Sequence, residues 1–262
     1  MTCADLTAAV VTRLRSAGCV FAEDEARLLV GAATGPDELD ALVARRVAGL
    51  PLEHLLGWAE FDGLRIVVGP GVFVPRRRTE ALVGESVALL AGHPAPVVLD
   101  LCCGAGAIGA AVATRLACAL ELHAAEIDPA AVACARRNVE PLGGHVYRGD
   151  LDEPLPSALR GRVIVLVANV PYVPTDAIAQ MPPEARDHEP ALALDGGADG
   201  LDVARRVAVL APRWLAPGGH LLIETGRAQA DLLVGEFTAA GLAPRIASDD
   251  DLGATLVVGT AP

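Results

Sequence analysis

The sequence predicts an α/β protein, a mostly parallel β-sheet with helices on both faces, preceded by a small helical domain. After Pro96, short apolar runs alternate with segments of helical periodicity, which is the pattern of parallel strands buried on both faces. A glycine-rich turn joins the first apolar run to the helix that follows it. Before Pro96, apolar residues recur first at helical spacing and then in alternation, which indicates helices followed by a hairpin. A length of 262 residues suffices for one sizeable domain with a small appendage.

Residues 1–57 are expected to form a helical substrate-docking domain. Leu6, Val10 and Leu14 lie at helical spacing, and Pro36 interrupts this pattern and starts another helix. A helical unit of this size is marginal alone, so we expect it to dock a partner.

Residues 58–78 are expected to form a β-hairpin linker. Residues 61–68 and 72–74 are strand-like, and Gly-Pro-Gly at 69–71 is expected to supply the turn between them.

A third domain, residues 79–262, then carries the sheet. Its first helix is expected at 79–90, and two more at 106–116 and 129–139. Strands are expected at 97–101, 122–127, 145–148, 163–168, 220–224 and 254–259. The long segment 173–199 is rich in Pro, Asp and Gly, as functional or mobile loops are.

Composition argues against several classes of protein. The net charge is −12 and Arg carries all the positive charge, so broad binding to nucleic acid is not expected, although Arg76-Arg77-Arg78 is a local basic candidate. The six cysteines form no C-x-x-C pair and no metal-ligand set. No apolar stretch is long enough for a membrane span, and no leader precedes the helices, so reduced thiols in the cytoplasm are expected.

The glycine-rich turn after the first strand is a candidate cofactor loop. Gly104, Gly106 and Gly109 make a literal G-x-G-x-x-G between a strand and a helix, the pattern that binds dinucleotides. Asp100, four residues before Gly104, would repel a pyrophosphate but suits a ligand that carries an ammonium and a sulfonium. The loop therefore favours S-adenosylmethionine over NAD, with an ordinary strand-to-helix turn as the alternative.

Two further acids follow the next strands. Glu126 ends the second strand, where a carboxylate meets the ribose hydroxyls of either cofactor. Asp128, two residues on, is expected to cap the next helix. After the third strand, Asp150 and Leu151 could flank an adenine, or could form a plain polar turn.

Asn169-Val170-Pro171-Tyr172 follows the fourth strand at its carboxyl end and indicates methylation of a planar nitrogen. Such a nitrogen is a poor nucleophile because its lone pair is delocalised. The Asn169 side-chain oxygen and the backbone carbonyl just after it could accept both N–H groups and hold the nitrogen in line with the methyl group. The Tyr172 ring would pack against the planar group, and Pro171 would stiffen the turn. Asn and Pro are also common loop residues, so a plain loop is the alternative.

Beyond these residues, the chain resembles the protein-(glutamine-N5) methyltransferase family, PrmC or HemK, over nearly its whole length. The resemblance rests on 49–57 (GLPLEHLLG), Glu60-Phe61, 70–76 (PGVFVPR) with Thr79-Glu80, Glu189-Pro190, Ala193-Leu194 and Gly200-Leu201. It implies a class I (Rossmann-like) fold with a seven-stranded, mostly parallel sheet. It also implies S-adenosylmethionine as the cofactor and a protein substrate, a peptide-chain release factor or another glutamine-bearing translation protein.

Carried over by position, the resemblance puts the cofactor loop on Cys102, Cys103, Gly104, Ala105 and Gly106. It puts the ribose acid on Glu126, the adenine contact on Leu151, and the residue that touches both cofactor and glutamine on Asn169. The thiols of Cys102 and Cys103 are expected to act only as small apolar fillers.

The chain departs from the family pattern at three positions. Val170 replaces the first Pro of Asn-Pro-Pro-Tyr, and Arg77 and Arg78 replace residues that are usually Pro and acidic. Val170 retains its carbonyl, so the acceptor geometry survives while the substrate is open to change. Methylation of a nucleic-acid base of the adenine N6 type, methylation of a small molecule, and a non-catalytic or NAD-binding domain remain as alternatives.

Overall fold

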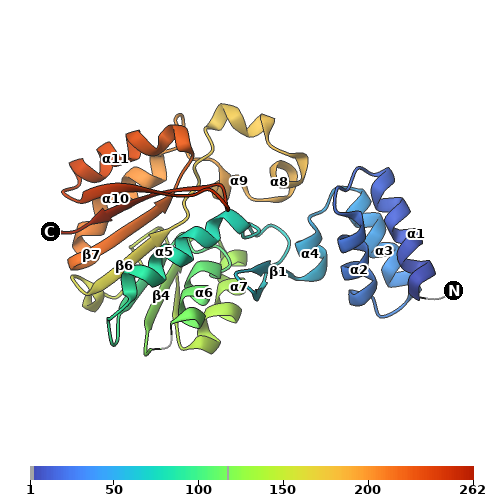
Figure 1. Cartoon of the computed structure of the whole chain (residues 1–262), viewed down its shortest axis with the longest axis horizontal. Helices are drawn as coiled ribbons and strands as arrows, with labels where there is room; N and C mark the ends of the chain where they lie inside the picture. The colour runs from blue at the N-terminus through green and yellow to red at the C-terminus, as the bar shows by residue number, and fades with distance from the viewer. Residues whose placement is uncertain (1–2, 117) are drawn as a thin grey trace.

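A small helical bundle stands to one side of a larger α/β domain (Figure 1). The computed structural model describes residues 3–116 and 118–262. The bundle confirms the helices expected in 1–57, and it has its own core in which Leu14, Leu29 and Val43 are fully buried. Its helices are α1 (Cys3–Ser16), α2 (Ala22–Ala32), α3 (Pro36–Val47) and α4 (Leu52–Leu56).

A two-stranded hairpin follows, and its turn is not where it was expected. Strands β1 (Trp58–Phe61) and β2 (Leu64–Val67) are antiparallel and joined by Asp62-Gly63. Both turn residues have positive φ, 53° and 75°, which matches the twist of a two-residue hairpin and explains why Asp-Gly suits it. Residues 69–71 do form a turn, closed by a hydrogen bond from the N–H of Val72 to the carbonyl oxygen of Gly69 at 3.1 Å, but the prediction that it joins two strands, with one at 72–74, was wrong. That segment runs without strand pairing, and Val72 and Val74 pack into the core of the larger domain.

The larger domain confirms a seven-stranded, mostly parallel sheet. The strand order is β5-β4-β3-β6-β7-β9-β8, with the first five strands parallel to one another and β9 antiparallel to both of its neighbours, β7 and β8. The strands are β3 (Val97–Leu101), β4 (Glu121–Glu126), β5 (His145–Arg148), β6 (Val163–Ala168), β7 (Leu215–Glu224), β8 (Ala243–Asp249) and β9 (Ala254–Thr260). Sequence patterning missed β8 because this edge strand is largely exposed and lacks an apolar run.

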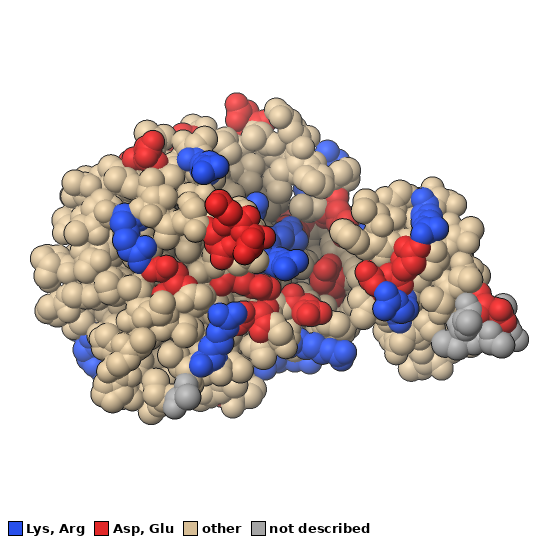
Figure 2. Space-filling model, in the orientation of Figure 1, with Lys and Arg blue, Asp and Glu red and all other residues tan. Residues whose placement is uncertain are grey.

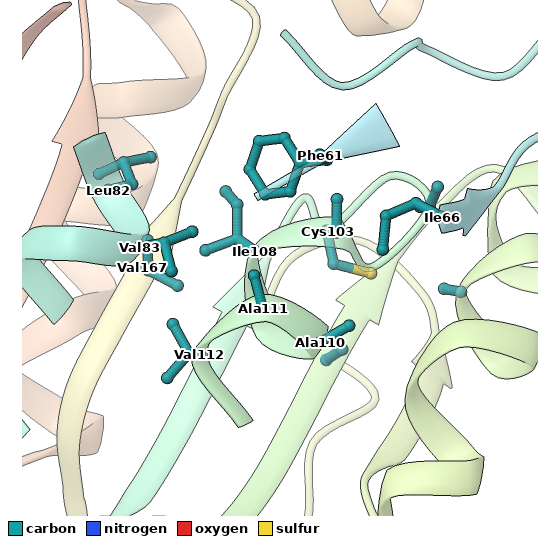
Figure 3. Packing of buried hydrophobic residues seen from close by; sticks show 14 of the residues in the cluster. Phe61, Ile66, Leu82, Val83, Cys103, Ile108, Ala110, Ala111, Val112 and Val167 are labelled. Atoms are coloured by element: carbon teal, nitrogen blue, oxygen red, sulfur yellow. The ribbon is translucent and has the colours of Figure 1, made fainter. Parts of the chain in front are cut away.

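Helices cover both faces of the sheet. On one face lie α5 (Glu80–Leu90), α6 (Ala107–Arg115) and α7 (Pro129–Val139), and on the other α10 (Asp202–Trp214) and α11 (Ala230–Ala239). The hairpin joins the first face: Figure 3 shows Phe61 in one apolar cluster with Ile108 of α6 and Leu82 of α5. None of the helices in the described chain is long and apolar enough to cross a membrane.

The segment 173–199 contains short helical turns, a 3₁₀ helix at Thr175–Gln180, α8 (Pro183–His188) and α9 (Ala191–Leu194). It also contacts the helical bundle. Arg46 of α3, held by buried Glu25 at 2.6 Å, places its Nη1 atom 3.3 Å from Oε1 of Glu184 in α8. One guanidinium therefore joins the bundle to this segment.

Candidate functional site

A cavity of about 320 Å³ opens at the carboxyl ends of β3, β4, β5 and β6. The chain moves outward from β3 to β4 and β5 and then returns to the other side of β3, so this edge is the point at which strand order reverses. Ligands of open α/β sheets bind at such a crevice. Figure 2 shows the surface hollowed where the helical bundle meets the larger domain, with acidic and basic side chains both gathered there.

The glycine loop forms one wall of the cavity. Cys102 and Gly104 line it, and both adopt left-handed backbone conformations, with φ of 52° and 55°. Gly106, with φ of 75°, precedes α6, and a Cβ there would lie 2.7 Å from Cγ2 of Val139. Only glycine therefore lets the loop pack so closely against α7. Cys103, Ala105 and Gly106 support the loop from behind and do not line the cavity.

Glu126 ends β4 and lines the cavity, as expected. Its Oε2 accepts the backbone N–H of Gly104 at 2.8 Å, and its Oε1 accepts those of Ile127 at 2.8 Å and Asp128 at 2.9 Å. A carboxylate carries roughly four acceptor positions and no donor, so capacity remains for hydroxyl groups of a ligand. Asp128 caps α7 by accepting from the backbone of Ala130 and Ala131, as its position predicted.

Asp100 lies beneath the loop rather than in the cavity, which corrects the direct cofactor contact expected of it. Alternate residues of β3 face opposite sides of the sheet, and Asp100 faces the side that α6 covers. Its Oδ2 accepts the N–H of Gly109 in α6 at 2.9 Å, while its Oδ1 is buried without a partner. Burial raises the pKa of Asp100 to about 7, although the bond from Gly109 lowers it.

Asp100 should therefore make the cofactor-free protein less stable as pH rises. Between the ordinary aspartate pKa and about 7, Asp100 holds a proton in the folded chain that it has lost in the unfolded chain. The free energy of unfolding therefore falls by a few kcal/mol over that pH range, on the order of 1.4 kcal/mol per pKa unit. Asp100→Asn keeps an acceptor for Gly109 and cannot ionise. We expect its melting temperature, relative to the wild type, to be higher at pH 8 than at pH 5. An equal difference at both pH values would contradict this origin of the effect.

The turn after β5 forms the opposite wall. Leu151 lines the cavity with only 6% of its surface exposed and adopts a left-handed conformation with φ of 48°. Asp150 also lines it and pairs with Arg206 at 2.8 Å. Ile127 was not expected here, yet its side chain lines the same cavity and is 43% exposed. An apolar residue this exposed beside an acid suits a flat ligand that covers it.

The segment 169–172 follows β6 and closes the inner end of the cavity. Nδ2 of Asn169 donates to Oγ1 of Thr79 at 3.5 Å, and Oδ1 of Asn169 is buried without a partner. Val170 is buried against α10 and β7, and within the described residues no hydrogen bond reaches its carbonyl oxygen. Two hydrogen-bond acceptors of this segment, Oδ1 of Asn169 and the carbonyl oxygen of Val170, therefore have no donor among the described residues.

The rest of this segment is held firmly. The carbonyl oxygen of Tyr172 accepts from Nε2 of Gln229 at 3.0 Å, and its hydroxyl contacts the guanidinium of Arg78. Gly200 packs directly on the Tyr172 backbone, where a Cβ would lie 2.3 Å from that carbonyl. The Gly200-Leu201 motif therefore serves close packing behind the segment.

Comparison with known proteins agrees with this geometry. A family model described as "Methyltransferase small domain" matches residues 64–181. The release factor glutamine methyltransferase of Geobacter sulfurreducens is 42% identical over 229 residues, which cover 86% of this chain and 78% of that protein. The chain belongs to the release factor glutamine methyltransferase family. It is an N-methyltransferase that takes its methyl group from S-adenosylmethionine, and the cofactor prediction is confirmed.

A further relative of this methyltransferase is named for a different substrate, and one solved structure resembles the chain in its fold. The 4-amino-L-phenylalanine/4-methylamino-L-phenylalanine methyltransferase of Streptomyces pristinaespiralis is 38% identical over 204 residues, 76% of this chain and 69% of that protein. The hMettl16 catalytic domain, solved with the MAT2A 3′UTR hairpin 6, is 16% identical with a TM-score of 0.57 and 84% of each chain covered. At that identity the likeness shows the shared fold alone.

The cavity of this methyltransferase fits S-adenosylmethionine. The carboxylate of Glu126 offers only acceptors, which suits ribose hydroxyls, and Ile127 and Leu151 offer apolar surfaces for a base. Burial, with the nearby carboxylates of Glu126 and Asp100, raises the pKa of both Cys102 and Cys103. The two thiols are therefore neutral and unreactive, in keeping with a filling role. In the described ranges no group of His, Cys, Asp and Glu is arranged to hold a metal ion.

Sequence reasoning assigned no role to many residues that line the cavity. The family motifs contained several of them, but no spacing rule connects the linker or the 173–199 segment to the strand ends. Arg76 is one case: its Nη2 lies 2.6 Å from both carboxylate oxygens of buried Glu189, which ties the linker to that segment. The other principal ones are Val72, Phe73, Arg78, Met181, Pro190, Leu192, Ala193, Leu194, Val203 and Arg206.

Proposed function

We propose that this methyltransferase modifies the side-chain amide nitrogen of a glutamine in a protein, a peptide-chain release factor or a related translation protein. Asn169 carries the proposal. Its amide group donates to Thr79 through Nδ2, which leaves Oδ1 as a buried acceptor with no partner next to the cavity. A buried acceptor of this kind costs about 1–3 kcal/mol unless a ligand supplies a donor. A primary amide has two N–H groups to offer.

In the proposed reaction, S-adenosylmethionine supplies a methyl group on a positively charged sulfur. Oδ1 of Asn169 and the Val170 carbonyl each accept one N–H of the target amide, and the Tyr172 ring packs against its plane. These bonds withdraw the N–H protons from the line of attack and stabilise positive charge that develops on nitrogen. Asn169, Pro171 and Tyr172 are thus proposed as catalytic, and Val170 as part of the substrate site. The proton leaves after transfer, so no strong base is required.

We assign the cofactor contacts to the residues that line the cavity. Glu126 accepts the ribose hydroxyls, while Ile127 and Leu151 lie on the two sides of the adenine. Cys102 and Gly104 provide the loop wall, with Cys103, Ala105 and Gly106 behind it. Asp150, paired with Arg206, borders the adenine end.

The helical bundle is proposed to dock the protein substrate. The turn between α1 and α2 exposes Val20 at 83% and Phe21 at 69%, and Phe21 is an aromatic residue of the kind that anchors interfaces. Replacing both with serine should raise KM for the protein about tenfold or more, since burying one such side chain contributes roughly 1.5–3 kcal/mol. KM for S-adenosylmethionine and kcat should not change. Val209→Ser on α10, where Val209 is 77% exposed, is the matched control and should alter nothing. Unchanged KM for the protein in the double variant would remove the bundle as a docking element.

A small amine with a carboxylate is the second candidate substrate. Arg78 lines the cavity and lies over the Tyr172 ring, with 5.4 Å between the guanidinium carbon and the ring centroid. It places positive charge where the family pattern is usually acidic. Its Nε pairs with buried Glu224 at 2.9 Å, and the half-exposed remainder of the guanidinium could accept a substrate carboxylate as a second partner. The Streptomyces pristinaespiralis relative acts on an amino acid with an aromatic amine.

Labelled S-adenosylmethionine distinguishes these substrates. The protein is incubated with a release factor that carries Gly-Gly-Gln, with the same factor carrying Gly-Gly-Glu, and with 4-amino-L-phenylalanine. We expect label on the first alone, with mass spectrometry placing one methyl group on the glutamine. Label on both factors would refute glutamine as the target, and label on the amino acid alone would establish the second candidate.

A further inference from the structure

We propose that a second cavity beside the methylation site is a subsite for a positively charged side chain of the protein substrate, an arginine or a lysine, and that Glu224 is the residue that recognises it. The proposal deepens the function proposed above and rests on it, because the occupant belongs to the protein whose glutamine is methylated. Neither the sequence motifs nor the methyl transfer described above gives Glu224 a role.

The second cavity has a volume of about 280 Å³, which gives room for one long side chain. Its walls come from the end of β7, from the turn between β8 and β9, and from Arg78 and Tyr172. Arg78 and Tyr172 also line the cavity in which methylation is proposed, so the two cavities share a wall. A substrate chain that presents its glutamine in the first cavity would therefore reach the second with a residue close to that glutamine.

Glu224 brings a buried carboxylate to this second cavity. Its side chain is only 2% exposed. Oε1 lies 2.9 Å from Nε of Arg78, whereas Oε2 is buried and has no hydrogen-bond partner among the described residues. A buried acceptor that has lost its water without gaining a donor is destabilising, and such atoms are rare in folded proteins. Oε2 of Glu224 therefore indicates a donor that a ligand supplies.

Arg78 favours the ionised form of Glu224. Burial raises the pKa of the Glu224 carboxyl, and the positive charge of Arg78 lowers it. An ionised carboxylate accepts hydrogen bonds and donates none, so the group that meets Oε2 must carry an N–H or an O–H. Two parts of the Arg78 guanidinium are already engaged, Nε with Oε1 of Glu224 and Nη2 with the hydroxyl of Tyr172.

The charges around the second cavity favour a cation over a neutral donor. The lining contains three carboxylates, those of Glu224, Asp249 and Asp250, and two guanidinium groups, those of Arg78 and Arg227. Negative charge is therefore in excess. A hydrogen bond from a charged donor to a carboxylate is roughly twice as strong as one between neutral groups. An arginine or lysine side chain would both supply the missing donor to Oε2 and balance this charge.

Binding of a small arginine derivative tests the subsite. The probe is N-acetyl-L-arginine N-methylamide, and N-acetyl-L-citrulline N-methylamide is its neutral counterpart of nearly the same shape. Each compound is titrated by calorimetry into the protein saturated with S-adenosylhomocysteine, the demethylated cofactor, which keeps the cofactor site filled. We expect the arginine compound to bind about tenfold more tightly than the citrulline compound, because only the former offers a charged donor to Glu224.

Three variants show whether this preference comes from the second cavity. Glu224→Gln removes the buried charge and should abolish the preference for the arginine compound. Asp250→Asn lies at an exposed position, where folding is not at risk, and should weaken the preference about twofold to fivefold. Glu121→Gln is the matched control, since Glu121 begins β4 and pairs with Arg162 away from both cavities, and it should bind like the wild type.

Competition shows whether the protein substrate uses the subsite. With a release factor as substrate, the arginine compound should raise KM for the factor several-fold and leave kcat unchanged, and the citrulline compound should do neither. In Glu224→Gln the arginine compound should no longer raise KM above the variant's own value.

Equal binding of the two compounds by the wild type would overturn the subsite, as would an undiminished preference in Glu224→Gln or in Asp250→Asn. Binding without competition would overturn its assignment to the substrate. If the release factor takes up no methyl group, the glutamine target is refuted, while the binding measurements still decide whether Glu224 recognises a cation.

Discussion

Asn169→Ala is expected to abolish methyl transfer while the protein still binds its cofactor. The change removes one of the two proposed acceptors for the target N–H groups, and removing one such preorganised group typically lowers kcat about 10²–10³-fold. Loss of alignment between nitrogen and methyl group adds to this effect. Affinity for S-adenosylmethionine should stay within about tenfold, because Asn169 is assigned mainly to the substrate.

The measurement is single-turnover transfer of labelled methyl together with calorimetric binding of S-adenosylmethionine. Asn169→Asp is the matched variant, since it keeps an oxygen acceptor of nearly the same reach, and it should retain more activity than the alanine variant. Full turnover in Asn169→Ala would show that the residue is not catalytic.

Glu126→Gln is expected to weaken cofactor binding about tenfold to a hundredfold, although the side chains are nearly the same size. Glu126 faces three backbone N–H donors, those of Gly104, Ile127 and Asp128, with its two oxygens. In a glutamine at this position one of the two oxygens becomes an NH₂ group. That NH₂ group then faces a backbone N–H of the loop or a ribose hydroxyl group, which loses its hydrogen-bond acceptor. Bonds to a charged group contribute roughly 1.5–3 kcal/mol, and 1.4 kcal/mol corresponds to about tenfold in affinity.

Calorimetry with S-adenosylmethionine checks this expectation. Glu121→Gln is the matched control, because Glu121 begins the same strand, pairs with Arg162 and lies at the far end from the cavity. It should bind like the wild type. Unaltered affinity in Glu126→Gln would mean that the carboxylate supports the loop without contacting the ribose.

The sequence predicted those parts of the fold and site that depend on strand ends. Glu126 and Asn169 both follow apolar runs, and in a parallel sheet such ends must meet at one edge, which is where the structure has them. Six strands of the sheet followed from the same alternation, and the number seven came from the family resemblance. Leu151, in the turn after the third strand, lines the same cavity, and its contact with the adenine stays a prediction.

The remaining features depend on information that spacing does not contain. Whether Asp100 faces the cavity or α6 depends on which side of the sheet that helix covers, and one residue of register reverses the answer. Arg78 and Glu224 are 146 positions apart in the sequence and meet only because β7 pairs with β6 and the linker crosses the same edge. The hairpin turn was misplaced because Gly-Pro-Gly is the more prominent turn signal in the sequence, whereas Asp62-Gly63 is the pair that matches the strand twist.

Val170 is better understood from its surroundings than from the motif it alters. Its side chain is 2% exposed and packs into the core beneath the cavity, while its carbonyl accepts no hydrogen bond among the described residues. A branched apolar side chain satisfies the core at this position. The atom proposed to meet the substrate belongs to the backbone, which explains how the motif can vary here.

The single guanidinium of Arg46 has a thermodynamic consequence. Its partners lie in two places, Glu25 in the bundle and Glu184 in the segment whose later residues cover the cofactor cavity. If a docking macromolecule rearranges the ion pairs of Arg46, it also changes the free energy of the segment 173–199, which lies over the cofactor cavity. By linkage, the factor by which a docked partner alters cofactor affinity must equal the factor by which bound cofactor alters partner affinity. Neutralising Arg46 is expected to weaken any such coupling, and it also leaves the buried carboxylate of Glu25 without its cation.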